Sequence, residues 1–194
     1  MPEVNEPWEL WSDDVYSRYE DYGDTVSDVK VYWWSGDDTN YSRWGSHQTL
    51  SCTPGDGYDD EIYDADSIHD WSYYGGSGLD IVDRQPADGS SNEENSIGLS
   101  ISYSGVSINW TYSQGGDVDR TLDVNRDNIA YSWYWDDFDN GEDSSTFETG
   151  TEIAADTSPG LQDTLYKQDT EVGYYGDDGT MGYHDFAQYI DMDD

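Results

Sequence analysis

The stretch IGLSISYSGVSINWTY, residues 97–112, decides the fold class, because apolar and polar residues alternate on both sides of Ser104-Gly105. Side chains of a β-strand alternate between two faces, and a two-residue turn fixes the pairing register. With Ser104-Gly105 as the turn, the predicted cross-strand pairs are Tyr103/Val106, Ile101/Ile108, Leu99/Trp110 and Ile97/Tyr112. Aromatic and branched pairs of this kind stabilise antiparallel sheets. The sequence therefore predicts a β-hairpin with one preferred register.

The opposite face of this hairpin carries only small, uncharged residues, namely Gly98, Ser100, Ser102, Ser107, Asn109 and Thr111. One apolar and one polar face are typical of an antiparallel sheet that packs on a core with one side and meets water with the other. We therefore expect a second layer to cover the apolar face. The uncharged polar face is one that a partner can approach without meeting the acidic remainder of the chain.

The N-terminal segment PWELWSDDVYSRYEDY, residues 7–22, has the spacing of an amphipathic helix. One helical stripe would contain Trp8, Trp11, Val15, Tyr19 and Tyr22. Pro7 suits the first turn of a helix and Gly23 suits its C-terminal end. The sequence predicts a helix over residues 7–22 that packs on the sheet.

Further alternating segments predict strands around Val29–Trp33, Ile129–Trp135 and Thr146–Ile153. Residues 53–95 are rich in Gly, Asp, Ser and Asn and predict a long loop-rich region, with room for short strands around Ile62 and Ile81-Val82. Several strands with one helix indicate a mainly β fold, an antiparallel β-sandwich or jelly roll. The length of 194 residues fits a single β-rich domain over residues 1–194.

The composition is strongly acidic, with 44 Asp and Glu residues against 7 Lys and Arg, and a net charge of −37. Such a chain repels itself over roughly 10 Å in dilute buffer and over about 3 Å in 1 M salt. The 9 Trp and 18 Tyr argue against disorder, because disordered acidic chains are poor in aromatic residues. Abundant Asp and scarce Lys resemble the proteins of extreme halophiles. The alternatives are a DNA-mimicking inhibitor and an acidic binding protein of low-salt environments.

Several classes of protein are disfavoured by the same residues. Nucleic acid is not an expected partner, because phosphate binding needs a basic surface. The longest apolar runs, such as Val31-Tyr32-Trp33-Trp34, are far shorter than a membrane-spanning helix, so no membrane insertion is expected. No signal peptide is visible, so either one has been removed or the chain never crosses a membrane. Cys52 is the single cysteine and is expected to be a small buried residue.

The region from Ser96 to Ile153 contains the SISYSG and SINWTYSQ halves of the hairpin, the segment YSWYWD and the end FETGTEI. It looks like uncharacterised secreted proteins of haloarchaea. This resemblance implies an extracellular β-sandwich and implies no activity.

Two acidic loops are candidate sites for Ca²⁺ or Na⁺. The segment DDGTMGYHDF, residues 177–186, resembles the second half of an EF-hand loop, with Asp177, Asp178 and Asp185. The match fails at the first ligand positions, which hold Tyr174 and Gly176. The loop WDDFDNGED, residues 135–143, offers Asp136 and Asp139. No cofactor is certain, and solvated carboxylates are the alternative for both loops.

No catalytic motif is present. His47, His69 and His184 have no zinc spacing, and each of His69-Asp70 and His184-Asp185 is expected to be a surface histidine beside an acid. A pair of Asp or Glu residues acting in glycoside hydrolysis is possible in principle, but 44 acids make pairs by chance. No catalytic residue is assigned, and an enzyme is not expected.

Aromatic residues give the remaining candidate site. Trp33, Trp34, Trp44, Trp71 and Trp135 exceed what the hairpin core needs, and a Trp patch on a sheet binds a sugar ring or a protein. Core packing is the alternative for these residues. The first functional hypothesis is therefore a halophile extracellular or surface structural or binding protein that acts through this patch, on protein (self or other) or glycan, including as a homo-oligomer. A carbohydrate-binding module, a small glycoside hydrolase and a virion surface protein of a haloarchaeal virus are the alternatives.

Overall fold

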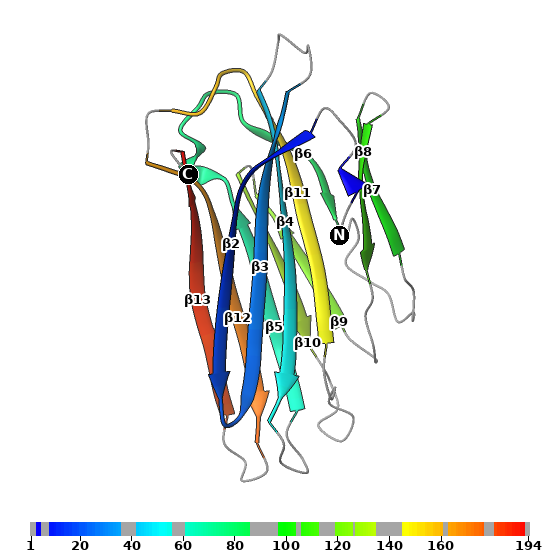
Figure 1. The fold of residues 1–194 in the computed structure, drawn as a ribbon, viewed down its shortest axis with the longest axis vertical. Helices are drawn as coiled ribbons and strands as arrows, with labels where there is room; N and C mark the ends of the chain where they lie inside the picture. Colours follow the sequence, from blue (N-terminus) through cyan, green and yellow to red (C-terminus); the bar gives the residue numbers. More distant parts are fainter. Residues whose placement is uncertain are drawn as a thin grey trace.

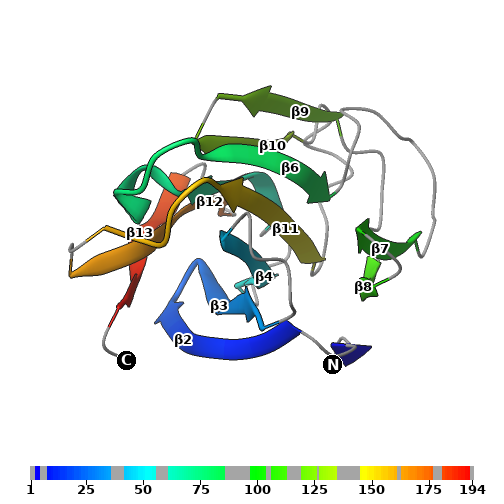
Figure 2. The same cartoon turned by 90° about the horizontal axis from the view of Figure 1, so that it is seen from above.

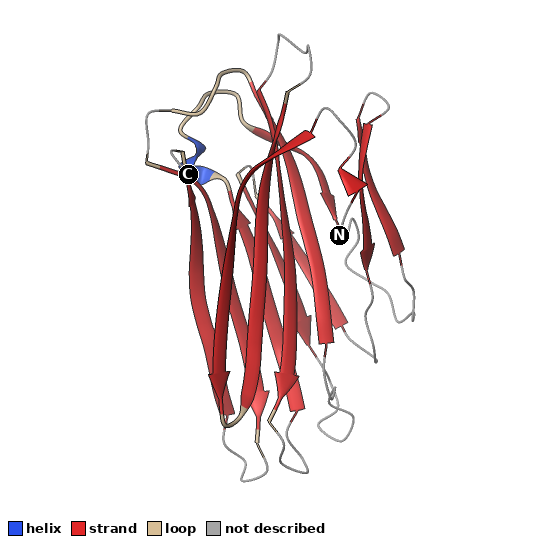
Figure 3. Cartoon of the chain, in the orientation of Figure 1, coloured by secondary structure: helices blue, strands red, loops and turns tan. Residues whose placement is uncertain are grey.

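The computed structural model describes residues 3–4, 8–35, 42–55, 61–85, 97–103, 106–112, 119–125, 127–134, 145–160, 163–176 and 181–192. The strands are β1 (Glu3–Val4), β2 (Trp8–Glu20), β3 (Gly23–Trp34), β4 (Ser42–Pro54), β5 (Glu61–Asp70), β6 (Asp80–Gln85), β7 (Ile97–Tyr103), β8 (Val106–Tyr112), β9 (Asp119–Val124), β10 (Asn128–Tyr134), β11 (Ser145–Ala155), β12 (Thr164–Tyr175) and β13 (Met181–Asp191). A short 3₁₀ helix, η1 (Ser72–Tyr74), is the helical element of these residues (Figure 3). The mainly β prediction is confirmed.

Two five-stranded antiparallel sheets form the body of the molecule. The first sheet has the order β13-β12-β5-β10-β9, and the second has the order β2-β3-β4-β11-β6. The two sheets face each other as layers, with their long strands running along the long axis (Figures 1 and 2). A third, small sheet has the order β1-β8-β7 and lies beside the body. We call it the hairpin sheet.

Two apolar clusters fill the space between the layers, and each takes residues from both sheets. One contains Leu50 and Phe147 of the second sheet with Ile62, Tyr131 and Trp133 of the first. The other is built around Val31, Trp44, Trp71, Tyr166 and Ile190. Cys52 is buried in the first cluster, as expected. The predicted strands near Val29, Ile129 and Thr146 are confirmed as β3, β10 and β11.

The predicted helix over residues 7–22 is wrong, because β2 pairs with β3 along its whole length through a turn at Asp21-Tyr22. The register shifts between Leu10 and Ser12, and this irregularity disturbs the two-residue period of a strand. The apolar side chains then separate onto two faces: Trp11 packs against the core, while Val15 and Tyr19 are exposed. The apolar residues of this segment are therefore three or four positions apart, as in an amphipathic helix, although the segment is a strand.

The loop-rich interpretation of residues 53–95 missed two elements of the body. The ten-residue strand β5 occupies the centre of the first sheet, and β6 forms an edge of the second. Alternation in β5 is hidden because its inward positions include polar Ser67 and His69, both fully buried. The weaker signals around Ile62 and Ile81-Val82 did mark these strands.

Candidate functional site

The β7–β8 hairpin has the register that its sequence predicts. Tyr103 pairs with Val106, Ile101 with Ile108 and Leu99 with Trp110. The predicted turn residues Ser104 and Gly105 lie outside the described residues. Alternation and cross-strand pairing therefore place all apolar positions of the hairpin on one face and all Ser, Gly, Asn and Thr positions on the other.

The hairpin belongs to neither large sheet. It follows edge strand β6 in the sequence, and β8 pairs with the two residues of β1. Contacts join β8 to β11 and β7 to β6, so the hairpin sheet lies against the outer side of the second sheet. Figure 2 shows it as a separate layer beside β11. The hairpin is therefore its own small layer rather than part of the body, and the expectation that its apolar face is covered stays a prediction.

The hairpin segment is also chemically unlike the rest of the chain. Residues 95–116 contain no Asp, Glu, Lys or Arg, although 26% of the whole chain is charged. Each of its strands has seven residues, which at about 3.3 Å per residue spans roughly 23 Å. A long, uncharged and amphipathic hairpin outside the core is therefore the most unusual feature of this structure.

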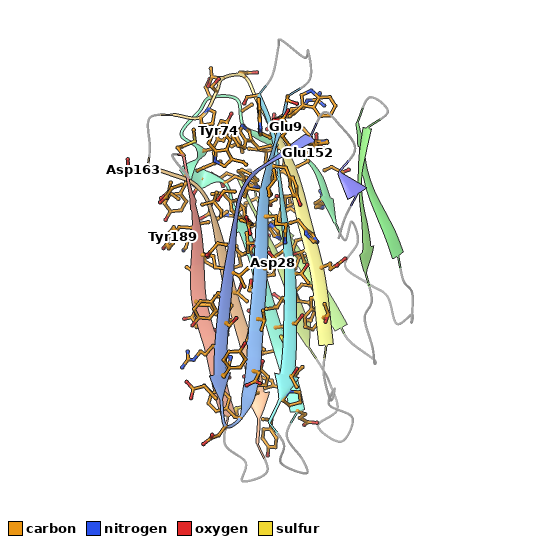
Figure 4. The ribbon with its side chains drawn as sticks, viewed as in Figure 1. Glu9, Asp28, Tyr74, Glu152, Asp163 and Tyr189 are labelled. Atoms are coloured by element: carbon orange, nitrogen blue, oxygen red, sulfur yellow. The ribbon has the colours of Figure 1, made fainter. Side chains whose placement is uncertain are left out.

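Ionisable residues lie buried on the outward side of the second sheet. In β4 every residue from Arg43 to Gln48 is buried, and β11 is buried on both faces around Glu152. Arg43 and Glu152 approach to 3.9 Å. Burial raises the pKa of Glu152 to about 7, although Arg43 acts in the opposite direction. Figure 4 shows Glu152 near the end of the body where the hairpin lies.

A belt of hydrogen-bonded polar residues separates the two apolar clusters. His69 Nδ1 lies 2.8 Å from Ser46 Oγ, and His69 Nε2 lies 2.7 Å from Thr149 Oγ1. Gln48 Nε2 donates to Ser27 Oγ and Thr170 Oγ1, each at 2.8 Å. Burial lowers the pKa of His69 to about 3, so this ring is neutral. The expectation of a surface histidine at positions 69 and 184 is wrong, because both side chains are fully buried.

The Ser46–His69 pair has the residue types of a nucleophile and its base, but neither side chain has exposed surface. A substrate has no access to this pair. The belt therefore has a structural role, in which its buried polar groups hydrogen-bond one another.

A polar hollow of about 360 Å³ lies at one end of the body, lined by Trp71, Ser72, Gly75, Gly76, Ser77, Gly78, Leu79 and Asp127. Gly75 and Gly78 both have φ of 67°, a conformation that favours glycine. Asp127 is the carboxylate of this lining, whereas glycoside hydrolysis needs two.

The predicted Trp residues are spread over the molecule. Trp33, Trp44 and Trp71 belong to or pack against one apolar cluster between the sheets. Trp34 lies edge-to-face with Trp8, with ring centroids 5.3 Å apart. Trp135 lies outside the described residues.

Four of the five predicted metal ligands, Asp136, Asp139, Asp177 and Asp178, also lie outside the described residues. Asp185 is in β13, directly opposite Glu171 of β12. Within the described ranges no three His, Cys, Asp or Glu residues are grouped so as to hold a metal ion. The Ca²⁺ or Na⁺ site stays a prediction.

Comparisons with known proteins identify a related fold. No family model matches the chain. No curated protein matches it either. A solved structure of a protein described as "Pore forming protein" is similar with a TM-score of 0.53 and 8% identity, covering 98% of this chain and 91% of that one. The Clostridium perfringens NetB toxin in its membrane-inserted form gives a TM-score of 0.42 and 8% identity over 94% of this chain and 97% of that one.

Within the described residues, no helix has the length and apolar character needed to cross a bilayer. The prediction of a surface structural or binding protein is nevertheless wrong, as are its carbohydrate-binding, glycosidase and virion alternatives. The finding that overturns them is the shared fold with a solved pore-forming protein. The expectation of no membrane insertion is corrected by the same finding.

Proposed function

We propose that this chain is a pore-forming protein whose β7–β8 hairpin enters a lipid bilayer while the body stays in water as a β-sandwich. The observation that carries the proposal is the hairpin itself, an uncharged segment with one apolar and one polar set of positions, held outside both large sheets. The fold likeness to a solved pore-forming protein supports it.

The length of the hairpin fits this role. A transmembrane strand needs about 9–11 tilted residues. The strands β7 and β8 have seven residues each, and uncharged neighbours extend them to Asn95–Tyr103 and Val106–Gln114. The bilayer core can therefore take up the hairpin without meeting a charged side chain.

Because apolar and polar residues alternate, one face of the hairpin suits lipid and the other suits water. The positions of Leu99, Ile101, Ile108 and Trp110 face lipid in this proposal, and those of Ser100, Ser102, Ser107 and Asn109 face an aqueous pore. Small hydroxyl and amide side chains leave room for water and ions. This arrangement assigns the apolar face to lipid rather than to a protein core.

The surface beneath the hairpin lowers the cost of release. A buried ion pair loses the hydration of both charges, and its mutual attraction often does not restore that loss. Arg43, His47 and Glu152 are buried on the outward side of β4 and β11. Because β8 contacts β11, we infer that departure of the hairpin sheet returns water to these groups.

A membrane-inserted hairpin also requires neighbours. In lipid every backbone N–H and C=O group needs a hydrogen-bond partner, and a lone hairpin leaves both outer edges unpaired. Hairpins from several copies satisfy these edges by pairing side by side. The proposal therefore includes a homo-oligomer, acting outside the cell and, from its acidic composition, in a salt-rich medium.

The test compares adjacent residues on opposite faces of β7. A Lys at the bilayer midplane costs about 2–4 kcal/mol on a lipid-facing position. We expect Leu99→Lys to reduce dye release from phosphatidylcholine vesicles at least 100-fold. Ser100→Lys is the matched control, with the same charge in the same strand, and we expect it to keep dye release and to lower cation selectivity in planar bilayers.

Equal dye release by Leu99→Lys and wild type would contradict the lipid-facing assignment. Circular dichroism on both variants checks that the body remains folded. A second measurement places an environment-sensitive dye at Ile101→Cys and at Ser102→Cys, since native Cys52 is buried. The dye at position 101 should report an apolar environment with vesicles, and the dye at position 102 should not.

A further inference from the structure

Three ionisable side chains are buried on the side of the second sheet that faces the hairpin sheet. Arg43 is 5%, His47 2% and Glu152 1% exposed. Their neighbours Ser46 and Ile153 point the other way, because Ser46 is hydrogen-bonded to the first sheet and Ile153 packs between the sheets. The hairpin sheet lies on the outward side, where β8 contacts β11 and β7 contacts β6. We call these three residues, which lie at the contact of the hairpin sheet with the body, the ionisable cluster.

The surroundings of Glu152 favour its neutral form. Arg43 Nη1 lies 3.9 Å from Glu152 Oε1, too far for a hydrogen bond, and Oε1 has no hydrogen-bond partner within the described part of the chain. Asp83 lies directly opposite Glu152 in β6 and has the same charge. The hairpin sheet adds no cation, because β7 and β8 contain no charged residue and β1 contributes Glu3. Burial raises the pKa of Glu152 to about 7, with Arg43 lowering it and Asp83 raising it.

The surroundings of His47 also favour a neutral side chain. The residues directly opposite His47 are Lys30 in β3 and Gly150 in β11. Lys30 forms an ion pair with Asp28 of its own strand. Burial lowers the pKa of His47 to about 3, and the charge of Lys30 acts in the same direction. A protonated His47 is therefore unfavourable under the hairpin sheet, as an ionised Glu152 is.

The two groups respond to pH in opposite directions. A glutamate in water has a pKa of 4.5, so between pH 4.5 and pH 7 the docked state binds a proton at Glu152 that the released state has lost. Glu152 therefore weakens docking as the pH rises through this window. A histidine in water has a pKa of 6.5, so below pH 6.5 the released state binds a proton at His47 that the docked state excludes. His47 therefore weakens docking as the pH falls from 6.5 toward 3.

We propose that Glu152 and His47 regulate release of the hairpin sheet in opposite directions: ionisation of Glu152 favours release as the pH rises, and protonation of His47 favours release as the pH falls. The proposal rests on the pore-forming function and adds what controls the departure of the hairpin from the body. Asp83 acts in the same direction as Glu152, because burial raises its pKa as well. The body therefore holds the hairpin most firmly in mildly acidic solution, where the two effects offset each other.

The experiment measures opening of this contact in solution, without vesicles. Every protein carries Ala154→Cys, at a half-buried position directly opposite Arg43 in the β4–β11 pair, and native Cys52 is buried. The rate at which iodoacetamide labels the new thiol is divided by the rate for an unfolded peptide of the same sequence at the same pH. This ratio gives the fraction of molecules in which the contact is open, and it cancels the pH dependence of the thiol itself.

Each single variant leaves one of the two effects in place. In His47→Gln the acid remains, and we expect the open fraction to rise at least tenfold from pH 5 to pH 8, since each unit of pKa difference corresponds to a factor of ten. In Glu152→Gln the base remains, and the open fraction should fall at least tenfold over the same range. The protein with both residues should change less than either variant. The control is Glu171→Gln, in β12 of the first sheet, and it should match the protein with both residues at every pH.

An open fraction that does not rise with pH in His47→Gln, or one that does not fall in Glu152→Gln, would overturn the proposal. The comparison uses the pH dependence within each variant, so a uniform weakening of docking by the loss of the ion-pair partner of Arg43 does not change the result. Near-ultraviolet circular dichroism at pH 5 and pH 8 shows whether the body remains folded, and therefore whether labelling reports the hairpin contact.

Dye release from phosphatidylcholine vesicles separates this proposal from the pore-forming function. If labelling shows the two opposite pH dependences and no protein releases dye, the regulation of the hairpin contact stands and the pore is refuted. If wild type releases dye and the labelling of both variants is independent of pH, the regulation is refuted and the pore stands.

Discussion

The β7–β8 hairpin and the outer face of the first sheet both lie outside the space between the two large sheets, yet they have opposite chemistry. Across the first sheet, Asp66, Glu171 and Asp185 lie directly opposite one another on three adjacent strands. The hairpin has no charged residue over residues 97–112. We call Asp66, Glu171 and Asp185 the carboxylate row. Its charges favour contact with water, whereas an uncharged hairpin with alternating polar and apolar residues is compatible with both water and lipid. Under the proposed function, this difference separates the body, which stays hydrated, from the hairpin, which enters the bilayer.

The largest expected effect is on the free energy of unfolding, and it compares a residue between the two large sheets with a residue of the hairpin. Phe147 is buried between the sheets, 4.7 Å from the Trp133 ring centroid. Phe147→Ala should lower the free energy of unfolding by about 3–5 kcal/mol. Trp110→Ala, in the hairpin, should lower it by less than about 1 kcal/mol, because β8 belongs to neither large sheet. Urea titration followed by tryptophan fluorescence measures both, and equal losses would mean that the hairpin is part of the core.

The next effect is an acid-dependent loss of stability that belongs to the body alone. Burial lowers the pKa of His69 from 6.5 to about 3, with a smaller effect of His47. Its contribution to stability is therefore complete above pH 6.5 and is lost as the pH falls toward 3. Between pH 6.5 and pH 4, wild type should lose roughly 3 kcal/mol of unfolding free energy relative to His69→Gln.

Urea titrations of both proteins at each pH give this difference. Other titrating groups, such as Asp64 and Glu152, are present in both proteins and cancel in the comparison. A difference that does not change with pH would show that His69 is protonated in the folded protein or is open to solvent.

The smallest effect concerns the carboxylate row. Like charges directly across a sheet are destabilising, so Glu171→Gln should raise the free energy of unfolding by about 0.2–1 kcal/mol in 0.05 M salt. The gain should disappear in 1 M salt, where the Debye length is about 3 Å. Glu148→Gln is the control, because its partner across the β4–β11 pair is Thr49. If the gain persists in 1 M salt, repulsion is not its cause.

Local alternation explains which elements were predictable. Strands β3, β7, β8, β10 and β11 alternate apolar with polar residues, and the register of the hairpin follows from its two-residue connection. Strands β4, β5 and β12 carry polar residues inward, such as Gln48, Ser67 and Thr170, because these residues pair across the two sheets. The hydrogen-bond partners of these residues lie on other strands, so no local sequence pattern predicts that the residues point inward.

Only part of the candidate site could be predicted from the sequence. The alternation indicates the neutral face of the hairpin, but it also predicts a core that covers the apolar face. The Trp patch was expected on a surface, whereas Trp71 and Trp44 are buried between the sheets. The absence of charge from residues 95–116 in so acidic a chain was the signal that could have suggested the proposed membrane role.

By itself the sequence determined the hairpin, its register and its two chemically distinct faces, because neighbouring residues and a short turn specify these features. Only the tertiary structure decided that the hairpin lies outside the body, that β2 is a strand with apolar residues on both faces, and that His69 is buried. These features depend on pairing between different strands, such as β2 with β3 and β5 with β12. They also depend on burial, which is decided by the strands that pack over a residue and not by the residue type.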